Sequence, residues 1–264
     1  MRLSAPNFSL QHTLESGQLF RYEKVPEGYL VSHRDKVFVI SQEGDELVVH
    51  HATRNVTSEW LKHFFALDEL PPKPVDSFTR EALEHCGGLR VCRQDPWECT
   101  IGFICSQNNS VPRIRQLMTG LARAFGTPVA VGPYTGYLFA EPGQISAGIK
   151  LAALKAGYRE EYIVLASEVL SDEWLESLAE LSYDSARHWL LKMRGIGPKV
   201  ADCILLFAYR HKNAFPVDTW VEQIMREDYN IQNKKDMHVA ARRVFGEEAG
   251  IMQQYLFHYK RNRT

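Results

Sequence analysis

The spacing of apolar residues changes part-way along the chain, and this change limits the possible folds more than any other feature. Residues 29–52 contain short runs rich in β-branched and aromatic residues, separated by the turn-forming segments Arg34-Asp35 and Glu43-Gly44-Asp45. Beyond residue 75, apolar residues recur at helical spacing, for example within residues 114–121 and 200–207. The sequence therefore predicts an α+β protein, with an N-terminal antiparallel β-sheet followed by a mostly α-helical region.

A proline-rich stretch, Pro71-Pro72-Lys73-Pro74, separates these two regions. Proline has no backbone N–H and clashes with a continuing helix, so this stretch ends the short amphipathic helix predicted for residues 60–67. Consecutive prolines also stiffen the chain, as is typical of a linker. We therefore expect an N-terminal antiparallel β domain over residues 1–75 and an α-helical region over residues 76–264.

Composition excludes several classes of protein. The 264 residues are 45% hydrophobic and 24% charged, which is typical of a folded globular protein and not of a disordered chain. No uncharged apolar run approaches the roughly 20 residues that a bilayer-spanning helix needs, so we expect no membrane association. The first ten residues lack the apolar core of a secretory signal, and an intracellular location is expected.

The cysteine pattern argues against both disulfides and a metal centre. The cysteines are Cys86, Cys92, Cys99, Cys105 and Cys203. An odd number in a long chain is a poor match to a secreted disulfide framework. No pair has the C-x-x-C spacing that is common in zinc and iron–sulfur sites. We therefore expect reduced thiols, no bound metal and no cofactor.

A glycine hairpin, Gly195-Ile196-Gly197, lies between two helical patterns in a positively charged segment. Residues 185–215 contain six cations and one carboxylate, although the whole chain has a net charge of −1. Paired glycines permit a tight turn, and the amides at the start of the following helix form an anion site suited to phosphate. Together with Lys192, the hairpin favours contact with a nucleic-acid backbone. A plain αα-hairpin with a solvated, charged face is the structural alternative.

Two residues beyond the hairpin carry candidate chemistry. Lys199 stands at the start of the second helix, where its amine is a candidate nucleophile toward a sugar carbon. Asp218 precedes a further helical pattern and can serve as its N-cap. Its carboxylate can also stabilise an oxocarbenium-like transition state, and the two roles are compatible.

These residues resemble the signature of the helix-hairpin-helix DNA glycosylases, a glycine hairpin followed by a lysine and, about twenty residues later, by an aspartate. Residues 195–204, GIGPKVADCI, are similar to the corresponding segment of the 8-oxoguanine DNA glycosylases. Residues 13–21 (TLESGQLFR), 94–113 (QDPWECTIGFICSQNNSVPR) and 250–257 (GIMQQYLF) also resemble segments of that family. Trp220 departs from the family, whose better-known members have a phosphate-contacting histidine there.

The resemblance implies roles for particular side chains. In a base pocket, Cys203 and Phe257 would face opposite sides of an extruded purine, and Gln253 would read its Watson–Crick edge. Gly17 would offer its backbone carbonyl to the N7–H that distinguishes 8-oxoguanine from guanine. The residues that would fill the gap in the duplex and bind the opposite cytosine are Asn108, Arg113, Tyr158 and Arg159.

The resemblance also implies a monomeric base-excision repair enzyme that acts on double-stranded DNA containing oxidised guanine. Lys199 would displace 8-oxoguanine opposite cytosine, form a Schiff base and nick the strand by β-elimination, with Asp218 stabilising the developing charge. Two alternatives remain open: a glycosylase for another damaged or mismatched base, and a non-catalytic module that only grips the DNA backbone. The enzyme would act in the nucleoid of a prokaryote or in the nucleus of a eukaryote.

Overall fold

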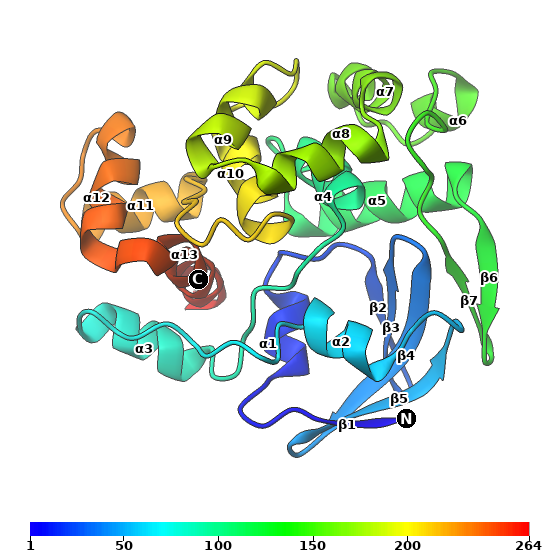
Figure 1. The fold of residues 1–264 in the computed structure, drawn as a ribbon, viewed down its shortest axis with the longest axis horizontal. Coiled ribbons are helices and arrows are strands. Elements are labelled where there is room, and N and C mark those ends of the chain that lie inside the picture. The colour runs from blue at the N-terminus through cyan, green and yellow to red at the C-terminus, as the bar shows by residue number, and fades with distance from the viewer. Residues whose placement is uncertain (264) are drawn as a thin grey trace.

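The computed structural model describes residues 1–263 and begins with a five-stranded antiparallel sheet (Figure 1). Its strands are β1 (Arg2–Ser4), β2 (Tyr22–Val25), β3 (Gly28–His33), β4 (Lys36–Glu43) and β5 (Glu46–Ala52). Their order across the sheet is β1-β5-β4-β3-β2. The turns between β3, β4 and β5 fall at residues 34–35 and 44–45, where the sequence predicts them.

One face of this sheet is covered by two short helices, α1 (Leu10–Glu15) and α2 (Ser58–Phe64). Phe38 of β4, Leu14 of α1 and Leu61 of α2 are fully buried in one apolar cluster between the sheet and these helices. Successive side chains of a strand point to opposite faces, so every second residue of β4 supplies this cluster.

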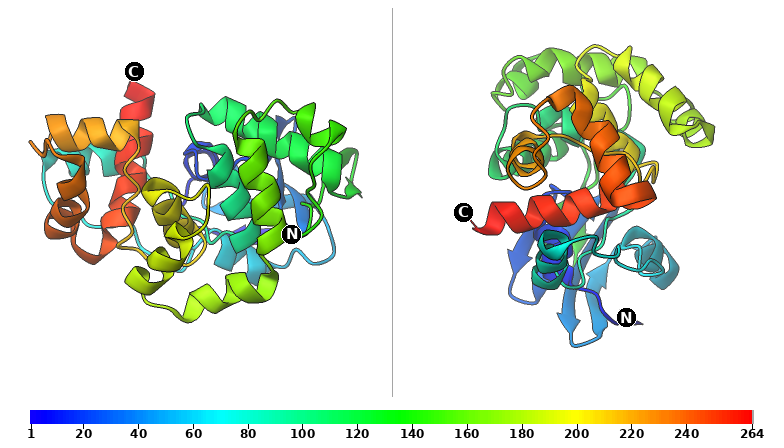
Figure 2. Two further views of the ribbon diagram at one scale, coloured as in Figure 1. Left: turned by 90° about the horizontal axis from the view of Figure 1, so that it is seen from above. Right: turned by 90° about the vertical axis from the view of Figure 1, so that its left-hand side faces the viewer.

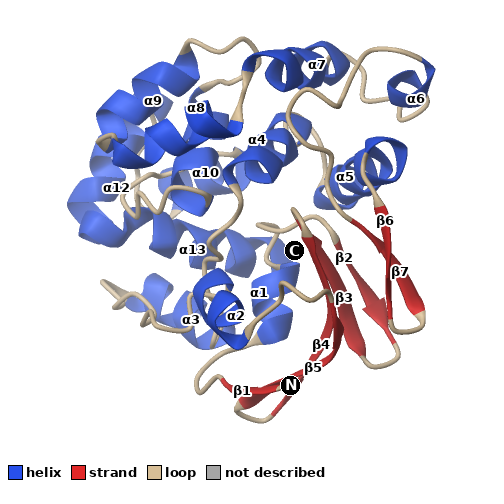
Figure 3. Cartoon of the chain, turned by 45° about the vertical axis from the view of Figure 1, so that its right-hand side comes forward, coloured by secondary structure: helices blue, strands red, loops and turns tan. Residues whose placement is uncertain are grey.

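The other face of the sheet packs against a second hairpin, β6 (Pro128–Val131) and β7 (Tyr134–Tyr137). Val131 of β6 joins Val37 and Val39 of β4 in a small buried cluster, and Figure 3 shows the hairpin alongside the main sheet. These strands come from the region that we expected to be mostly helical. The N-terminal sheet is thus covered partly by later residues, and the domain boundary at residue 75 stays a prediction.

The rest of the chain is mostly α-helical, which confirms the predicted α+β fold class (Figure 2). In chain order the helices are α3 (Ser77–His85), α4 (Pro96–Cys105), α5 (Val111–Phe125), α6 (Ile149–Ala152), α7 (Arg159–Val169), α8 (Asp172–Ser177), α9 (Tyr183–Leu191), α10 (Pro198–Phe207), α11 (Thr219–Glu227), α12 (Met237–Phe245) and α13 (Ala249–Arg263). Within residues 1–263, no helix is both long enough and apolar enough to cross a bilayer.

Helices α4 and α10 pack against each other at the centre of the helical region (Figure 1). Residues 97–105 of α4 and residues 200–207 of α10 are all buried. A helix that is buried on every side must be covered by other elements, and α4 is covered by α5, α7, α8 and α10. The end of α4 and the start of α10 are therefore firmly positioned.

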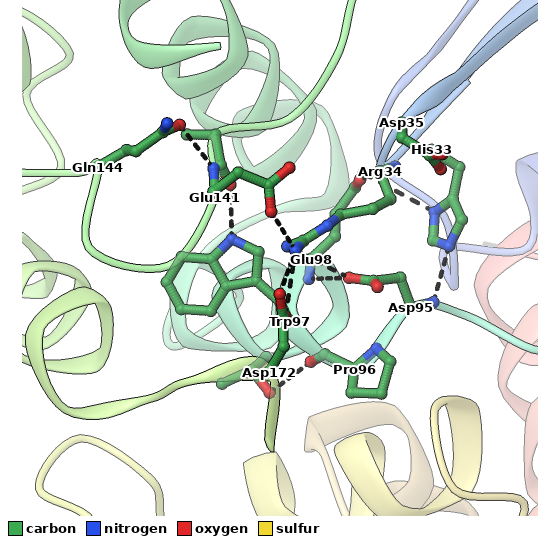
Figure 4. Close-up of polar contacts among 12 residues, drawn as sticks. His33, Arg34, Asp35, Asp95, Pro96, Trp97, Glu98, Glu141, Gln144 and Asp172 are labelled. Carbon is green, nitrogen blue, oxygen red and sulfur yellow. Dashed lines mark hydrogen bonds and ion pairs between the residues drawn. The ribbon is translucent and has the colours of Figure 1, made fainter. Parts of the chain in front are cut away.

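A buried polar network attaches the start of α4 to the sheet (Figure 4). Glu98 accepts hydrogen bonds from Nε and Nη2 of Arg21 at 2.7 and 2.8 Å, and from the Arg34 N–H at 2.5 Å. Asp95 caps α4, and its own N–H donates to Nε2 of His33 at 2.7 Å. Although burial opposes its ionisation, Arg21 and His33 hold the pKa of Glu98 below its usual range. This network fixes the direction in which α4 leads toward the site.

Candidate active site

The glycine hairpin connects α9 to α10. Gly195 has φ +92°, and a Cβ at this position would lie 2.5 Å from Cγ of Tyr162, so the turn requires glycine. Ile196 is buried and anchors the turn in the core. Gly197 is the N-cap of α10, and no side chain of the described residues caps this end of the helix. The first amides of α10 are therefore available to an anion.

Carboxylates neutralise part of the positive charge of the segment that contains the hairpin. Four of the six cations in residues 185–215 form ion pairs, which are Arg187–Asp202, Arg194–Glu161, Arg210–Glu69 and Lys212–Glu69. Lys192 is exposed at the hairpin, and its ammonium lies 4.1 Å from the centre of the Trp189 ring. The count of cations therefore overstates the charge that this surface offers to a partner.

Lys199 is the second residue of α10, and its amine lies where α10 meets the end of α4. Nζ donates a hydrogen bond to Oγ of Ser106 at 3.0 Å. The same nitrogen lies 5.2 Å from the centre of the Phe103 ring. Among the described residues no salt bridge holds this amine. A hydroxyl group and an aromatic face therefore position it, which leaves it suited to attack.

Cys203 lies one helical turn after Lys199 and is buried. Burial raises the pKa of its thiol to about 12, while the Lys199 ammonium opposes this rise. The thiol is therefore uncharged at neutral pH and presents a polarisable surface beside the amine. Within residues 1–263, no cysteine forms a disulfide and no group of His, Cys, Asp or Glu side chains is arranged to hold a metal ion.

Asp218 caps α11, because its Oδ1 accepts a hydrogen bond from the Val221 N–H at 2.8 Å. The predicted N-cap is therefore confirmed. Burial raises the pKa of the Asp218 carboxyl, and the N–H groups of the next turn and the Lys199 ammonium oppose the rise. One of these N–H groups belongs to Trp220. Lys199 and Asp218 thus lie within electrostatic reach of each other.

Helix α13 carries Gln253 and Phe257 one turn apart on one face, as their spacing predicts. Phe257 lies against Gly17, since a Cβ at Gly17 would be 3.2 Å from Cε1 of its ring. Gly17 has φ +84°, a conformation that favours glycine. Gln253 is 4% exposed, and its Oε1 has no hydrogen-bond partner among the described residues. A bound group that donates to this oxygen would satisfy it.

The segment around Gly17 is held rigidly by buried amide side chains. Nε2 of Gln254 on α13 donates to the Ser16 carbonyl at 3.0 Å. Nε2 of Gln18 donates to the Arg90 carbonyl at 2.7 Å, and its Oε1 accepts from the Cys92 N–H at 2.7 Å. The backbone carbonyl of Gly17 therefore has a fixed position relative to α13.

Three of the four residues expected at the opposite base lie together at the loop after α4. Asn108 is exposed with φ +48°, and Tyr158 is 52% exposed. Arg159 is buried, and its guanidinium lies 4.4 Å from the centre of the Tyr158 ring. It donates to the carbonyl of Gln107 at 2.7 Å and to that of Asn108 at 3.1 Å. In this structure Arg159 therefore holds the loop in shape, and its contact with cytosine stays a prediction.

Arg113, the fourth of these residues, stands in the first turn of α5. Its Nη2 donates to the carbonyls of Leu154 and Lys155 at 2.8 Å, in the loop that leads to Tyr158. It also lines a cleft of about 700 Å³ between α5 and the sheet. The same cleft is lined by the cations Arg115 and Arg123.

Sequence reasoning missed several residues at this site. Ser106 and Phe103 position Lys199, and Gln107 donates from Nε2 to the Gly195 carbonyl at 2.9 Å. All three lie within the segment that resembles the family, so closer attention to residues 94–113 would have found them. Arg261 lies beside Gly17 and Phe257, and its spacing of four residues from Phe257 was the available signal.

Comparisons with known proteins agree with this geometry. A family model described as the 8-oxoguanine DNA glycosylase N-terminal domain matches residues 1–100. A probable N-glycosylase/DNA lyase of Methanothermobacter thermautotrophicus is 34% identical over 205 residues, which cover 68% of this chain and 65% of that protein. The N-glycosylase/DNA lyase OGG1 of Arabidopsis thaliana is 32% identical over 247 residues, which cover 85% of this chain and 67% of that protein.

A solved structure shares the fold over nearly the whole chain. It is the 8-oxoguanine glycosylase/lyase of Clostridium acetobutylicum, in complex with double-stranded DNA containing cytosine opposite 8-oxoguanine. It is 27% identical to this chain, with a TM-score of 0.87, and the match covers 98% of this chain and 93% of that one. The chain therefore belongs to the 8-oxoguanine DNA glycosylase family.

Proposed function

We propose that this protein is a bifunctional DNA glycosylase that removes 8-oxoguanine opposite cytosine from duplex DNA and then cleaves the strand as an abasic-site lyase. One observation carries the proposal: the amine of Lys199 lies beside the Cys203 thiol and within reach of the Asp218 carboxylate, at the junction of three helices. A DNA substrate places the enzyme where the cell keeps its DNA, in a nucleoid or a nucleus.

The reaction follows from the chemistry of a primary amine at a sugar carbon. Nζ of Lys199, in its neutral form, attacks C1′ while the bond from C1′ to the base breaks, and the leaving base takes the electron pair and then a proton. Asp218 stabilises the positive charge that develops on the sugar. The C1′–O4′ bond then breaks, O4′ takes a proton, and C1′ and Nζ form a Schiff base. Loss of a proton from C2′ expels the 3′-phosphate with the electron pair of the C3′–O bond, and water then hydrolyses the Schiff base and releases Lys199.

The pocket for the extruded base would lie between α10 and α13. Phe257 stacks on one face of the purine and the uncharged Cys203 thiol contacts the other. Gln253 offers its buried Oε1 to an N–H donor on the Watson–Crick edge. The Gly17 carbonyl accepts the N7–H of 8-oxoguanine, whereas guanine would present a lone pair to it.

The DNA itself would be held on both sides of the extruded nucleotide. The amides near Gly195 and Gly197, aided by Lys192, bind backbone phosphates at the hairpin. Exposed Asn108 and Tyr158 fill the gap in the duplex. Arg113 and Arg159 exchange their present carbonyl partners for O2 and N3 of the opposite cytosine.

Borohydride trapping on a duplex with 8-oxoguanine opposite cytosine tests the proposal directly. Wild-type protein should form a covalent adduct with the DNA, and Lys199→Gln should form none while still binding the lesion duplex. Lys192→Gln is a matched control, because it removes an exposed cation near the hairpin and should still be trapped at saturating protein. Adducts with Lys199→Gln would move the nucleophile elsewhere, and the absence of wild-type adducts would favour a module that only binds DNA.

A further inference from the structure

Arg261 extends the pocket face of α13 by one further turn. Gln253, Phe257 and Arg261 are spaced by four residues, so their side chains follow one another along one side of the helix. Cζ of Arg261 lies 5.2 Å from the centre of the Phe257 ring. A Cβ at Gly17 would lie 2.6 Å from Nη1 of Arg261. The guanidinium therefore sits where Gly17 and Phe257 meet.

The guanidinium is held in this place from the side of α1. Nη2 of Arg261 donates to the carbonyl of Glu15 at 2.5 Å, two residues before Gly17. Burial lowers the pKa of Arg261, and Tyr22 and Asp218 oppose this change. A guanidinium keeps its charge in proteins, so the pocket contains a permanent cation with several N–H donors.

We propose that Arg261 is a specificity-determining residue that donates a hydrogen bond to the C8 carbonyl oxygen of the extruded 8-oxoguanine. This inference rests on the proposed function. In 8-oxoguanine the N7–H donor lies next to the O8 acceptor. The Gly17 backbone and the Arg261 guanidinium lie next to each other. In the proposal, the Gly17 carbonyl supplies the acceptor for N7–H and an Arg261 N–H group supplies the donor for O8. Guanine has a C–H group at C8 and cannot accept this bond.

The alternative acceptor for Arg261 is O6, on the other side of N7. An arginine that faces N7 and O6 makes the commonest specific contact with ordinary guanine. Such a contact would favour the undamaged base and oppose the selection made at Gly17. A contact with O8 instead adds to that selection, because only the oxidised base carries this oxygen.

The test compares Arg261→Met with wild type in single-turnover excision of 8-oxoguanine opposite cytosine and in cleavage at a preformed abasic site. Excision should slow about ten- to hundredfold, as expected for loss of a hydrogen bond to a charged donor. Abasic-site cleavage should stay unchanged, because no base is read there. Loss of the hydrogen bond to the Glu15 carbonyl should lower the melting temperature, but a stability loss alone affects both activities equally. Arg261→Lys, which keeps the charge without the planar fork, should give an intermediate rate.

Arg263→Met is the matched control, since Arg263 belongs to the same helix and its side chain is 59% exposed. It should retain wild-type excision. Unchanged or faster excision by Arg261→Met would overturn the inference, and equal loss of both activities would assign Arg261 a structural role. A wild-type protein that does not excise 8-oxoguanine would instead refute the proposed function.

A second substrate separates O8 from O6. In 8-oxoadenine O8 and N7–H are retained, but an amino group replaces O6. In a Lys199→Gln background, Arg261→Met should weaken binding of duplexes with 8-oxoguanine and with 8-oxoadenine by the same factor. A loss confined to 8-oxoguanine would assign the contact to O6 and overturn the O8 assignment.

Discussion

Acidification should destabilise this protein through His258, a buried histidine that joins two helices beside the proposed base pocket. Nε2 of His258 on α13 lies 3.1 Å from Nδ1 of His12 on α1. His258 is 3% exposed. Burial lowers its pKa to about 3, and the nearby Arg261 and His12 add to the effect, with Glu15 opposing it. A proton on His258 would therefore push apart the helices that carry Phe257 and lead to Gly17.

The size of the effect follows from the two pKa values. The unfolded chain binds this proton near pH 6.5, whereas the folded protein binds it only near pH 3. The contribution of the neutral imidazole to stability is therefore fully present above pH 6.5 and falls as the pH drops toward 3. At pH 5, about 1.5 pH units below 6.5, the loss is about 2 kcal/mol. For a chain of this size the melting temperature falls by roughly 4 to 8 °C.

Thermal unfolding of wild type and His258→Gln at pH 7.5 and pH 5 measures this contribution. Glutamine can still hydrogen-bond to His12 but does not titrate, and the acid sensitivity of other groups affects both proteins. We compare the melting temperature of the variant minus that of wild type at the two pH values. This difference should be roughly 4 to 8 °C larger at pH 5 than at pH 7.5. Exposed His188→Gln tests whether removal of any imidazole has this effect. A wild-type-to-variant difference that is the same at both pH values would refute the reasoning.

Three further predictions concern the proposed reaction. Asp218→Asn keeps the oxygen that caps α11 but loses the charge, so it should bind lesion DNA and excise slowly. Asp218→Ala should also lose about 1 kcal/mol of stability. Normal excision by the Asn variant would show that Asp218 acts only as a helix cap. Gly17→Val should lose 8-oxoguanine excision far more than cleavage at a preformed abasic site, because its Cβ would lie 2.6 Å from Nη1 of Arg261; equal loss would indicate a damaged fold. Arg113→Met should relax the preference for cytosine by roughly 1 to 3 kcal/mol, measured from excision rates opposite all four bases. A wild-type protein without such a preference would contradict the proposed contact of Arg113 with cytosine.

Features that depend on residues close together in the chain could be predicted from the amino-acid order alone. The change from strand to helical spacing predicts the α+β fold class, because side-chain periodicity follows directly from local backbone geometry. The same local rules place Lys199 and Cys203 on adjacent turns and Asp218 at the start of α11. The family resemblance adds the pocket residues, and Gln253 and Phe257 do share one face of a helix.

Contacts between distant segments became visible only in the folded structure. It brings Gly17 of the N-terminal region against Phe257 and Arg261 of the last helix. It packs the β6–β7 hairpin on the sheet and buries Arg159 of α7 against the loop after α4. It also pairs three of the six cations in residues 185–215 with the distant carboxylates of Glu161 and Glu69. These contacts depend on how whole faces of helices and sheets fit together, and local spacing along the chain carries no record of that fit.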